Sequence, residues 1–299
     1  MQGIILLNKP KGITSFGAVA AVRRICGTKR IGHTGTLDPL AEGVLPILVG
    51  RATALSSYIT DGDKGYTARV RLGLTTDTED ISGEVLSRCE AAVTEQELID
   101  VCRSFLGKSE QVPPMYSAIK MDGQRLYKLA REGKVVERKP REIEIKEIVC
   151  RDIKGEFFTL DVLCSKGTYI RSLCRDIGEK LGCGAVMCGL VRTLAAGFSV
   201  DDAVTLEQLE NDGAAAHLIS ADSAFAHLPY VQLTERQAVR FANGGEIDIA
   251  RTPYSPNADG EILRVRFGGV LLGLGRISLD CGQIKVECVI NDKDGSDSR

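Results

Sequence analysis

The carboxylate of Asp38 lies in a stretch of the chain whose residue types make the backbone unusually rigid. Three nearby glycines, Gly32, Gly35 and Gly43, permit backbone conformations that are closed to other residues. Pro39 fixes its own φ and pushes Asp38 toward an extended conformation. A carboxylate held in this way can serve as a nucleophile or a base, although an isolated Asp-Pro pair more often only starts a turn.

Apolar segments on both sides of this loop would anchor it to a core. Residues 3–7 form a short run that is typical of a strand, and residues 44–49 form another that we expect to be buried. Between them, Thr14 or Ser15 can cap a helix that ends at Gly27. Its apolar positions recur at helical spacing and are predicted to face the core: Phe16, Val19, Val22 and Ile25.

The next elements follow from the same periodicities. Strands are predicted at 66–72, with Tyr66, Ala68, Val70 and Leu72 on one face, at 142–145 and around 160–164. Helices are predicted at 51–60, at 94–107, with a stripe from Leu98 to Leu106 ended by Gly107, and at 168–182, with Thr168 as the cap.

Arg171 breaks a local rule. It falls in the first turn of the helix predicted at 168–182, where a cation opposes the helix macrodipole. A residue that violates a local preference often has a functional reason. Because Arg171 also borders the apolar stripe, its guanidinium could be partly buried against an acid.

Composition sets the broad class of the protein. The chain has 299 residues, enough for about two domains, and 43% hydrophobic with 26% charged residues is typical of a soluble globular protein. No apolar run approaches the ~20 residues of a membrane span, so we expect a cytoplasmic protein. The ten cysteines and three histidines show no zinc-ligand spacing, and we expect reduced cysteines and no metal.

The formal charge of −2 hides an uneven distribution. Residues 1–60 carry seven Lys or Arg against two acids, residues 120–141 carry eight against three, and residues 200–230 carry six acids and neither Lys nor Arg. This asymmetry fits a phosphate-binding face opposite an acidic one, or simply an ordinary charged surface. The basic residues of 111–141 are interleaved with Tyr116 and Tyr127, which suits an arm that closes over RNA backbone.

The chain changes character beyond residue 205. A short helix is predicted after Thr234, and alternation around 263–267 and 284–288 predicts strands separated by turns. A small β-barrel-like module from about 231 to 291 is the expected result. An OB-like module remains an alternative.

Six motifs in order resemble the TruB family, the tRNA pseudouridine-55 synthases. They cover the chain from about residue 3 to 200 and are NKPKG at 8–12, GHTGTLDPLAEG at 32–43, KGY at 64–66, PPMYSA at 113–118, GQRLY at 123–127 and SKGTYIR at 165–171. The resemblance implies an α+β fold with a mixed, mostly antiparallel central sheet. It divides the chain into a catalytic domain over 1–230, with an RNA-clamping insertion at about 120–141, a PUA-like RNA-binding domain over 231–291 and a disordered tail over 292–299.

The resemblance also assigns roles to residues. It makes Asp38 the catalytic group, pairs Arg171 with it, sets Tyr66 against the target base and puts Leu190 in the apolar wall of the same pocket. It makes His33 a wedge in the distorted RNA loop. Further RNA contacts are expected from basic residues in the NKPKG turn and the arm: Lys9, Lys120, Arg125, Lys128 and Arg131.

The implied enzyme is an isomerase that acts, as a monomer and without cofactor, on a uridine in the T-arm of tRNA. Asp38 must be ionised, and a nearby Arg171 is expected to lower its pKa. Attack at C1′, attack at C6 and proton abstraction at C2′ all remain open. Two rivals are a non-catalytic RNA-binding protein, which the rigid Asp38 loop disfavours, and an N-glycosidase, which a closed apolar pocket disfavours.

Overall fold

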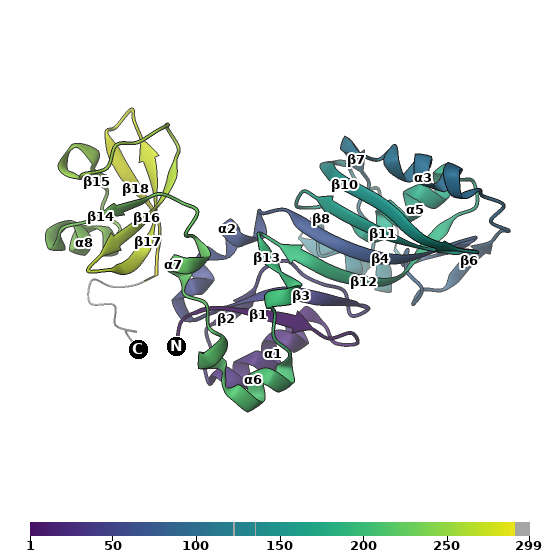
Figure 1. Ribbon diagram of the computed structural model, residues 1–299, viewed down its shortest axis with the longest axis horizontal. Helices are drawn as coiled ribbons and strands as arrows, with labels where there is room; N and C mark the ends of the chain where they lie inside the picture. Colours follow the sequence, from purple (N-terminus) through teal and green to yellow (C-terminus); the bar gives the residue numbers. More distant parts are fainter. Residues whose placement is uncertain (122, 135, 291–299) are drawn as a thin grey trace.

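The computed structural model describes residues 1–121, 123–134 and 136–290 (Figure 1). The predicted tail at 292–299 lies outside this range. The helices are α1 Ser15–Cys26, α2 Ser56–Thr60, α3 Glu95–Arg103, α4 Leu126–Arg131, α5 Ile170–Lys180, α6 Leu206–Asp212, α7 Ala221–Ala224 and α8 Glu235–Ala242. The strands are β1 Gly3–Lys9, β2 Ile31–His33, β3 Ala41–Val49, β4 Lys64–Leu72, β5 Leu74–Thr76, β6 Val85–Arg88, β7 Gly107–Gln111, β8 Lys120–Met121, β9 Gln124–Arg125, β10 Arg141–Lys154, β11 Phe157–Cys164, β12 Ala185–Ala195, β13 Phe198–Ser199, β14 Tyr230–Gln232, β15 Ile247–Asp248, β16 Ile262–Phe267, β17 Val270–Ser278 and β18 Gln283–Val289.

A nine-stranded sheet forms the larger part of the molecule. Its main order is β1-β3-β12-β4-β11-β10-β7, with β2 paired to β3 and β13 paired to β12. The pairing of β12 with β3 is parallel, and the other pairs described in this sheet are antiparallel. Helices α1 and α6 lie beside β1 and β3, while α3 and α5 lie beside the far end of the sheet (Figure 1). The predicted α+β fold with a mixed, mostly antiparallel sheet is confirmed.

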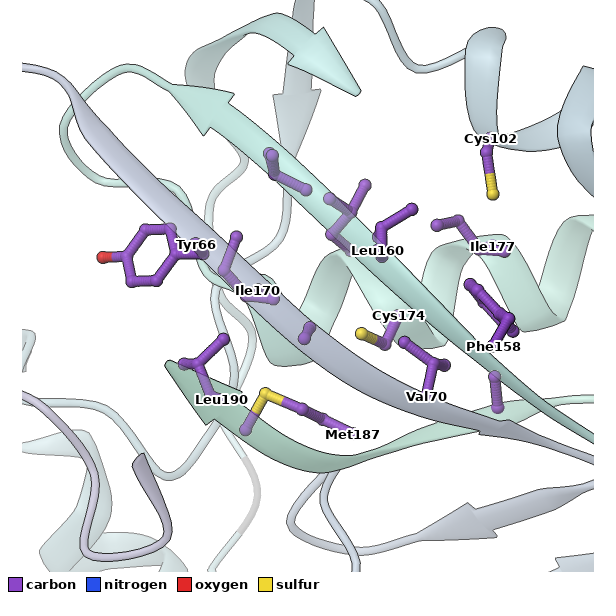
Figure 2. Close-up of a cluster of buried hydrophobic side chains, with 14 of the residues drawn as sticks. Tyr66, Val70, Cys102, Phe158, Leu160, Ile170, Cys174, Ile177, Met187 and Leu190 are labelled. Atoms are coloured by element: carbon purple, nitrogen blue, oxygen red, sulfur yellow. The ribbon is translucent and has the colours of Figure 1, made fainter. Parts of the chain in front are cut away.

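The main core lies between this sheet and α3 and α5. The predicted face of β4 is buried along its whole length, and α5 adds Ile170, Leu173, Cys174 and Ile177 to the same cluster (Figure 2). Both stripes follow from local spacing, because side chains return to the same face every second residue in a strand and every 3.6 residues in a helix. The packed core therefore fixes the start of α5 relative to β4 and β12.

Three local predictions are wrong for identifiable reasons. Phe16 is exposed, because the buried position in the first turn of α1 is Ser15, whose hydroxyl bonds to the backbone of Leu37. Leu106 is exposed, because α3 already ends at Arg103. Thr168 does not cap α5: the cap residue is Tyr169, whose backbone is held by a distant side chain described below.

The C-terminal part is a smaller, curled sheet (Figure 1). Its order is β14-β16-β17-β18-β15, and α8 covers its own apolar cluster, which includes Phe241, Leu263 and Ile284. The expected β-barrel-like module is therefore present in outline.

Candidate active site

Asp38 and Arg171 form an ion pair. Asp38 lies on the loop between β2 and β3, and Arg171 is in the first turn of α5. Arg171 Nε lies 2.9 Å from Asp38 Oδ2, and its Nη2 donates to Oδ1 at 3.4 Å. The Arg171 side chain is 6% exposed and that of Asp38 is 36% exposed. The arginine is therefore embedded, while the carboxylate remains open to a substrate on one side.

Arg171 also ties two further segments to the site. Its Nη1 donates to the carbonyl of Thr78 at 3.0 Å, and its Nη2 donates to the carbonyl of Tyr116 at 2.7 Å. Nearby, the buried Asp80 accepts hydrogen bonds from the backbone N–H of Ser82 and the hydroxyl of Thr78. A planar guanidinium suits this task because its donors point in several fixed directions.

The pKa of Asp38 corrects one prediction. We expected Arg171 to lower it, and the arginine does act in that direction. Burial, however, is the larger influence and raises the pKa of Asp38 above its usual value, and the neighbouring charge of Asp80 adds to the rise. Removing a carboxylate from water disfavours its charged form, and one ion pair does not offset that loss here.

The start of α5 is held from across the fold. The buried side chain of Gln111 accepts a hydrogen bond from the N–H of Tyr169 at 2.8 Å and donates to its carbonyl at 3.1 Å. Tyr169 is the cap residue of α5 and its own side chain makes no capping hydrogen bond, so Gln111 holds the backbone of the cap residue from outside the helix. It thereby fixes the turn that carries Arg171.

The Asp38 loop is clamped on both sides of the carboxylate. The hydroxyl of Ser15 donates to the carbonyl of Leu37 at 2.9 Å and accepts from its N–H at 2.8 Å. On the other side, the N–H of Gly12 donates to the carbonyl of Pro39 at 2.7 Å. These bonds give a physical basis for the rigidity expected from the sequence.

Tyr66 and Leu190 lie on neighbouring strands at one end of the core (Figure 2). Tyr66 is 8% exposed, and burial raises the pKa of its hydroxyl, so the group stays neutral. Leu190 is also 8% exposed and pairs with Ala41, whose N–H donates to the carbonyl of Asp38. Both side chains therefore belong to the apolar floor beside the ion pair.

Arg192 is a site residue that our sequence reasoning missed. It is 1% exposed, and its guanidinium donates to the carbonyls of Val44 and Gly35. Its charge also acts on the hydroxyl of Tyr66 and partly offsets the rise in the pKa of that group. Gly35 has φ +76°, and a Cβ there would meet Arg192 at 3.2 Å, so only glycine fits comfortably. The signal was available, because Arg192 is a charge inside an otherwise apolar strand.

Lys9 does not lie where we expected an RNA contact. It is fully buried, and its ammonium donates to the carbonyls of Pro10 and Ile13. Burial lowers the pKa of Lys9 to about 8, although the charge of Asp38 acts against the shift. A lysine placed in this way supports the loop electrostatically and cannot reach a phosphate.

His33 ends β2, close to the Asp38 loop. Burial and the charge of Arg192 lower the pKa of its ring, so His33 is neutral at neutral pH. Its Nδ1 is buried without a hydrogen-bond partner among the described residues. A neutral ring agrees with a wedge better than with a cation that binds phosphate.

The basic arm is exposed. It contains the short hairpin β8–β9 and helix α4, and Arg131 lies over the ring of Tyr127 at 5.6 Å. The four arm residues predicted to bind RNA all face solvent: Lys120, Arg125, Lys128 and Arg131.

In the described part of the chain, no group of three or more His, Cys, Asp or Glu side chains could hold a metal ion. None of the described helices is long and apolar enough to span a membrane. A cavity of about 330 Å³ is lined by residues of α2, β13 and α7, among others, and includes none of the residues described above.

Two family profiles together match residues 23–225 of the chain. Residues 23–170 match the TruB family pseudouridylate synthase N-terminal domain, and residues 171–225 match the tRNA pseudouridylate synthase B C-terminal domain. Two proteins named tRNA pseudouridine synthase B, from Pseudomonas fluorescens and Stutzerimonas stutzeri, are 45% and 46% identical to the chain. Each alignment covers 94% of this chain and 93% of the relative.

Solved structures agree on the fold. A crystal structure of a Cbf5-Nop10-Gar1 complex contains a chain that is 26% identical, with a TM-score of 0.75, over 98% of this chain and 86% of that one. The archaeal box H/ACA sRNP Nop10-Cbf5 complex gives a TM-score of 0.74 at 25% identity, over 99% and 88%. From these profiles, identities and folds we conclude that the chain belongs to the TruB family of pseudouridylate synthases.

Proposed function

We propose that the protein isomerises uridine 55 in the T-loop of tRNA to pseudouridine, with Asp38 as the catalytic group. The observation that carries the proposal is the Asp38–Arg171 pair, in which an embedded guanidinium aims a partly open carboxylate over an apolar floor. The relatives named tRNA pseudouridine synthase B support the choice of substrate.

The reaction needs neither a redox step nor an activated phosphate. The bond between C1′ and N1 breaks, the uracil rotates, and C5 bonds to C1′; the proton lost from C5 is matched by one gained at N1. Extracting the base from its stack costs a few kcal/mol. Stacking on an aromatic ring returns roughly 1–3 kcal/mol per base, so Tyr66 and phosphate contacts can offset the cost without ATP.

Several chain segments would hold the RNA. In this proposal His33 is a wedge in the T-loop. The catalytic domain spans residues 1–230, and its basic insertion binds the RNA backbone through Lys120, Arg125, Lys128 and Arg131. Residues 231–291 would be a PUA-like RNA-binding domain. We leave Lys9 out because its ammonium is buried. We expect the enzyme to work as a monomer in the cytoplasm.

The test is to replace Asp38 with Asn and analyse the nucleosides of an unmodified tRNA after incubation. We expect no pseudouridine and a tRNA affinity within a few-fold of the parent, because phosphate and stacking contacts supply most of the binding. Asp202→Asn, at an exposed aspartate in the acidic segment, is the matched control and should be fully active. Appreciable pseudouridine from Asp38→Asn would show that the catalytic group is misassigned, and free uracil from the parent would indicate an N-glycosidase.

A further inference from the structure

Phe16 is an exposed aromatic in an unusual place. Its side chain is 72% exposed, the largest value among the large hydrophobic residues described as exposed. Helical spacing predicts it to face the core, yet the neighbouring Ser15 takes the buried position. A large apolar ring kept in water next to a rigid loop contributes little to folding, but it offers an apolar face to a bound molecule.

The position of Phe16 relative to Asp38 is fixed by the chain. Ser15, one residue earlier, is hydrogen-bonded to Leu37, and Gly12 is hydrogen-bonded to Pro39. The segment 12–16 is therefore attached to both neighbours of the catalytic aspartate.

An exposed cation comes just before the segment 12–16 in the chain. Lys11 is exposed and has no described ion pair, while the other lysine of the same turn, Lys9, is buried. A Cβ built on Gly12 would have no atom within 4 Å, so the space in front of this turn is open. Exposed residues of the Asp38 loop, Thr36 and Pro39, continue the surface.

We infer that Lys11 and Phe16 form a nucleotide shelf, which binds a nucleotide of the substrate RNA next to the uridine that is isomerised. The base stacks on Phe16, and a phosphate of the same strand meets Lys11. The inference rests on the proposed function and adds residues that bind substrate but take no part in the chemistry. Base–aromatic stacking together with a phosphate-binding cation is the usual way to hold single-stranded RNA.

An RNA strand fits this surface better than a protein partner does. Protein interfaces need about 800 Å² on each side, whereas one ring and one cation match the size of a single nucleotide. The shelf also continues directly from the site where the target base must be extracted, and neighbouring nucleotides of an opened loop lose their own stacking there.

The test measures the affinity of an unmodified T-arm stem–loop RNA in an Asp38→Asn background, which prevents turnover. We expect Phe16→Ala to raise Kd about tenfold, the effect of losing one stacked base, with no change in its salt dependence. Phe16→Trp should bind within threefold of the parent, whereas Phe16→Leu should stay as weak as Phe16→Ala. Lys11→Gln should lower the slope of log Kd against log salt by ~0.7–0.9.

The matched control is Leu106→Ala, since Leu106 is 57% exposed at the end of α3, far from α1 (Figure 1). It should leave Kd unchanged, and the melting temperatures of all variants should match the parent. A Kd for Phe16→Ala within twofold of the parent would overturn the shelf, as would a Phe16→Leu variant that binds as well as Phe16→Trp. Single-turnover pseudouridine formation by the protein with Asp38 intact tests the proposed function separately. If no pseudouridine forms but Phe16→Ala still weakens RNA binding, the proposed function is wrong and the nucleotide shelf is still supported.

Discussion

At the scale of single residues, the site balances two opposing effects on one carboxylate. Burial favours the neutral form of Asp38, and the ion pair with Arg171 favours the charged form. Burial is the larger effect, so the pKa of Asp38 is raised although a guanidinium lies 2.9 Å away. Because the strength of a base rises with its pKa, the ionised form of Asp38 is a stronger base than an aspartate in water.

The first prediction concerns pH. In the proposed function the ionised form of Asp38 is the active one. Because burial raises the pKa of Asp38, kcat/KM should then fall with decreasing pH, by about tenfold per unit below that pKa. The midpoint of this acid limb should lie above ~3.9, the usual aspartate value. The measurement is pseudouridine formation at subsaturating tRNA, with the affinity of Asp38→Asn followed over the same range. An acid limb at or below the usual value would contradict the dominance of burial.

A second residue-scale prediction separates pairing from packing at Arg171. Arg171→Lys should lower the single-turnover rate about a hundredfold, because a lysine cannot donate to Asp38 and to two carbonyls in fixed directions. That drop corresponds to ~3 kcal/mol of transition-state stabilisation. Arg103→Lys, at an exposed arginine on α3, is the control. A folded Arg171→Lys variant that reacts within threefold of the parent would return Arg171 to a structural role.

At the scale of elements, the periodicity of the sequence predicts the buried faces and the ends of helices and strands, which depend on neighbouring residues. The buried face of β4, the stripe of α5 and the end of α1 at Gly27, where φ is 62°, all follow from spacing and residue type. The contact between Gln111 and Tyr169 spans 58 residues, and no periodicity encodes it. For the same reason the pairing of Arg171 with Asp38 was reached through the family resemblance, and the burial of Lys9 and Arg192 was not foreseen.

The third prediction tests this long-range cap. Gln111→Ala would leave the N–H of Tyr169 without its partner, at a cost of about 1–3 kcal/mol in the free energy of unfolding, while the carbonyl of Tyr169 keeps its hydrogen bond from the N–H of Leu173. Because α5 begins there, the single-turnover rate should fall while tRNA affinity is kept. Urea unfolding and the rate at saturating enzyme provide the two readouts. Gln96→Ala, which removes an exposed hydrogen bond to Asp100, is the control and should change neither.

If Gln111→Ala lowered stability but left the rate unchanged, the cap would stabilise α5 without positioning Arg171. Gln111→Glu refines the comparison, since it can still accept from the N–H of Tyr169 but can no longer donate to the carbonyl. Gln111→Glu should also be less stable than the parent, but its single-turnover rate should fall less than that of Gln111→Ala.

At the scale of the whole molecule, the two sheets share a core. One apolar cluster joins Leu6, Val44 and Leu48 of the large sheet to Leu274 and Ile290 of the C-terminal part. Polar contacts reinforce the junction, because the hydroxyl of Tyr58 donates to Glu287, which also pairs with Arg276. The strands β1 and β3 thus contribute to an apolar cluster that extends into the C-terminal sheet, and β3 begins directly after the Asp38 loop.

The last prediction follows from this shared core. Leu274 is fully buried in the junction, so Leu274→Ala should cost about 2–5 kcal/mol, and the loss should reach β3 as well as β17. Hydrogen exchange followed by mass spectrometry measures this directly as reduced protection of peptides from both strands. Leu263→Ala is the matched control, since Leu263 is equally buried but belongs to the separate core of the C-terminal sheet.

With Leu263→Ala, protection should fall in the C-terminal sheet and much less in β3, because no side chain of the shared cluster is removed. Unchanged protection of β3 in the Leu274→Ala variant would mean that the two parts unfold independently. If Leu274→Ala does weaken β3, the C-terminal part supports the catalytic loop through packing, whatever RNA contacts it makes. Since Leu274 is remote from Asp38 in the chain and touches no site residue, a lowered turnover at elevated temperature, with normal turnover when cool, would then be the functional consequence.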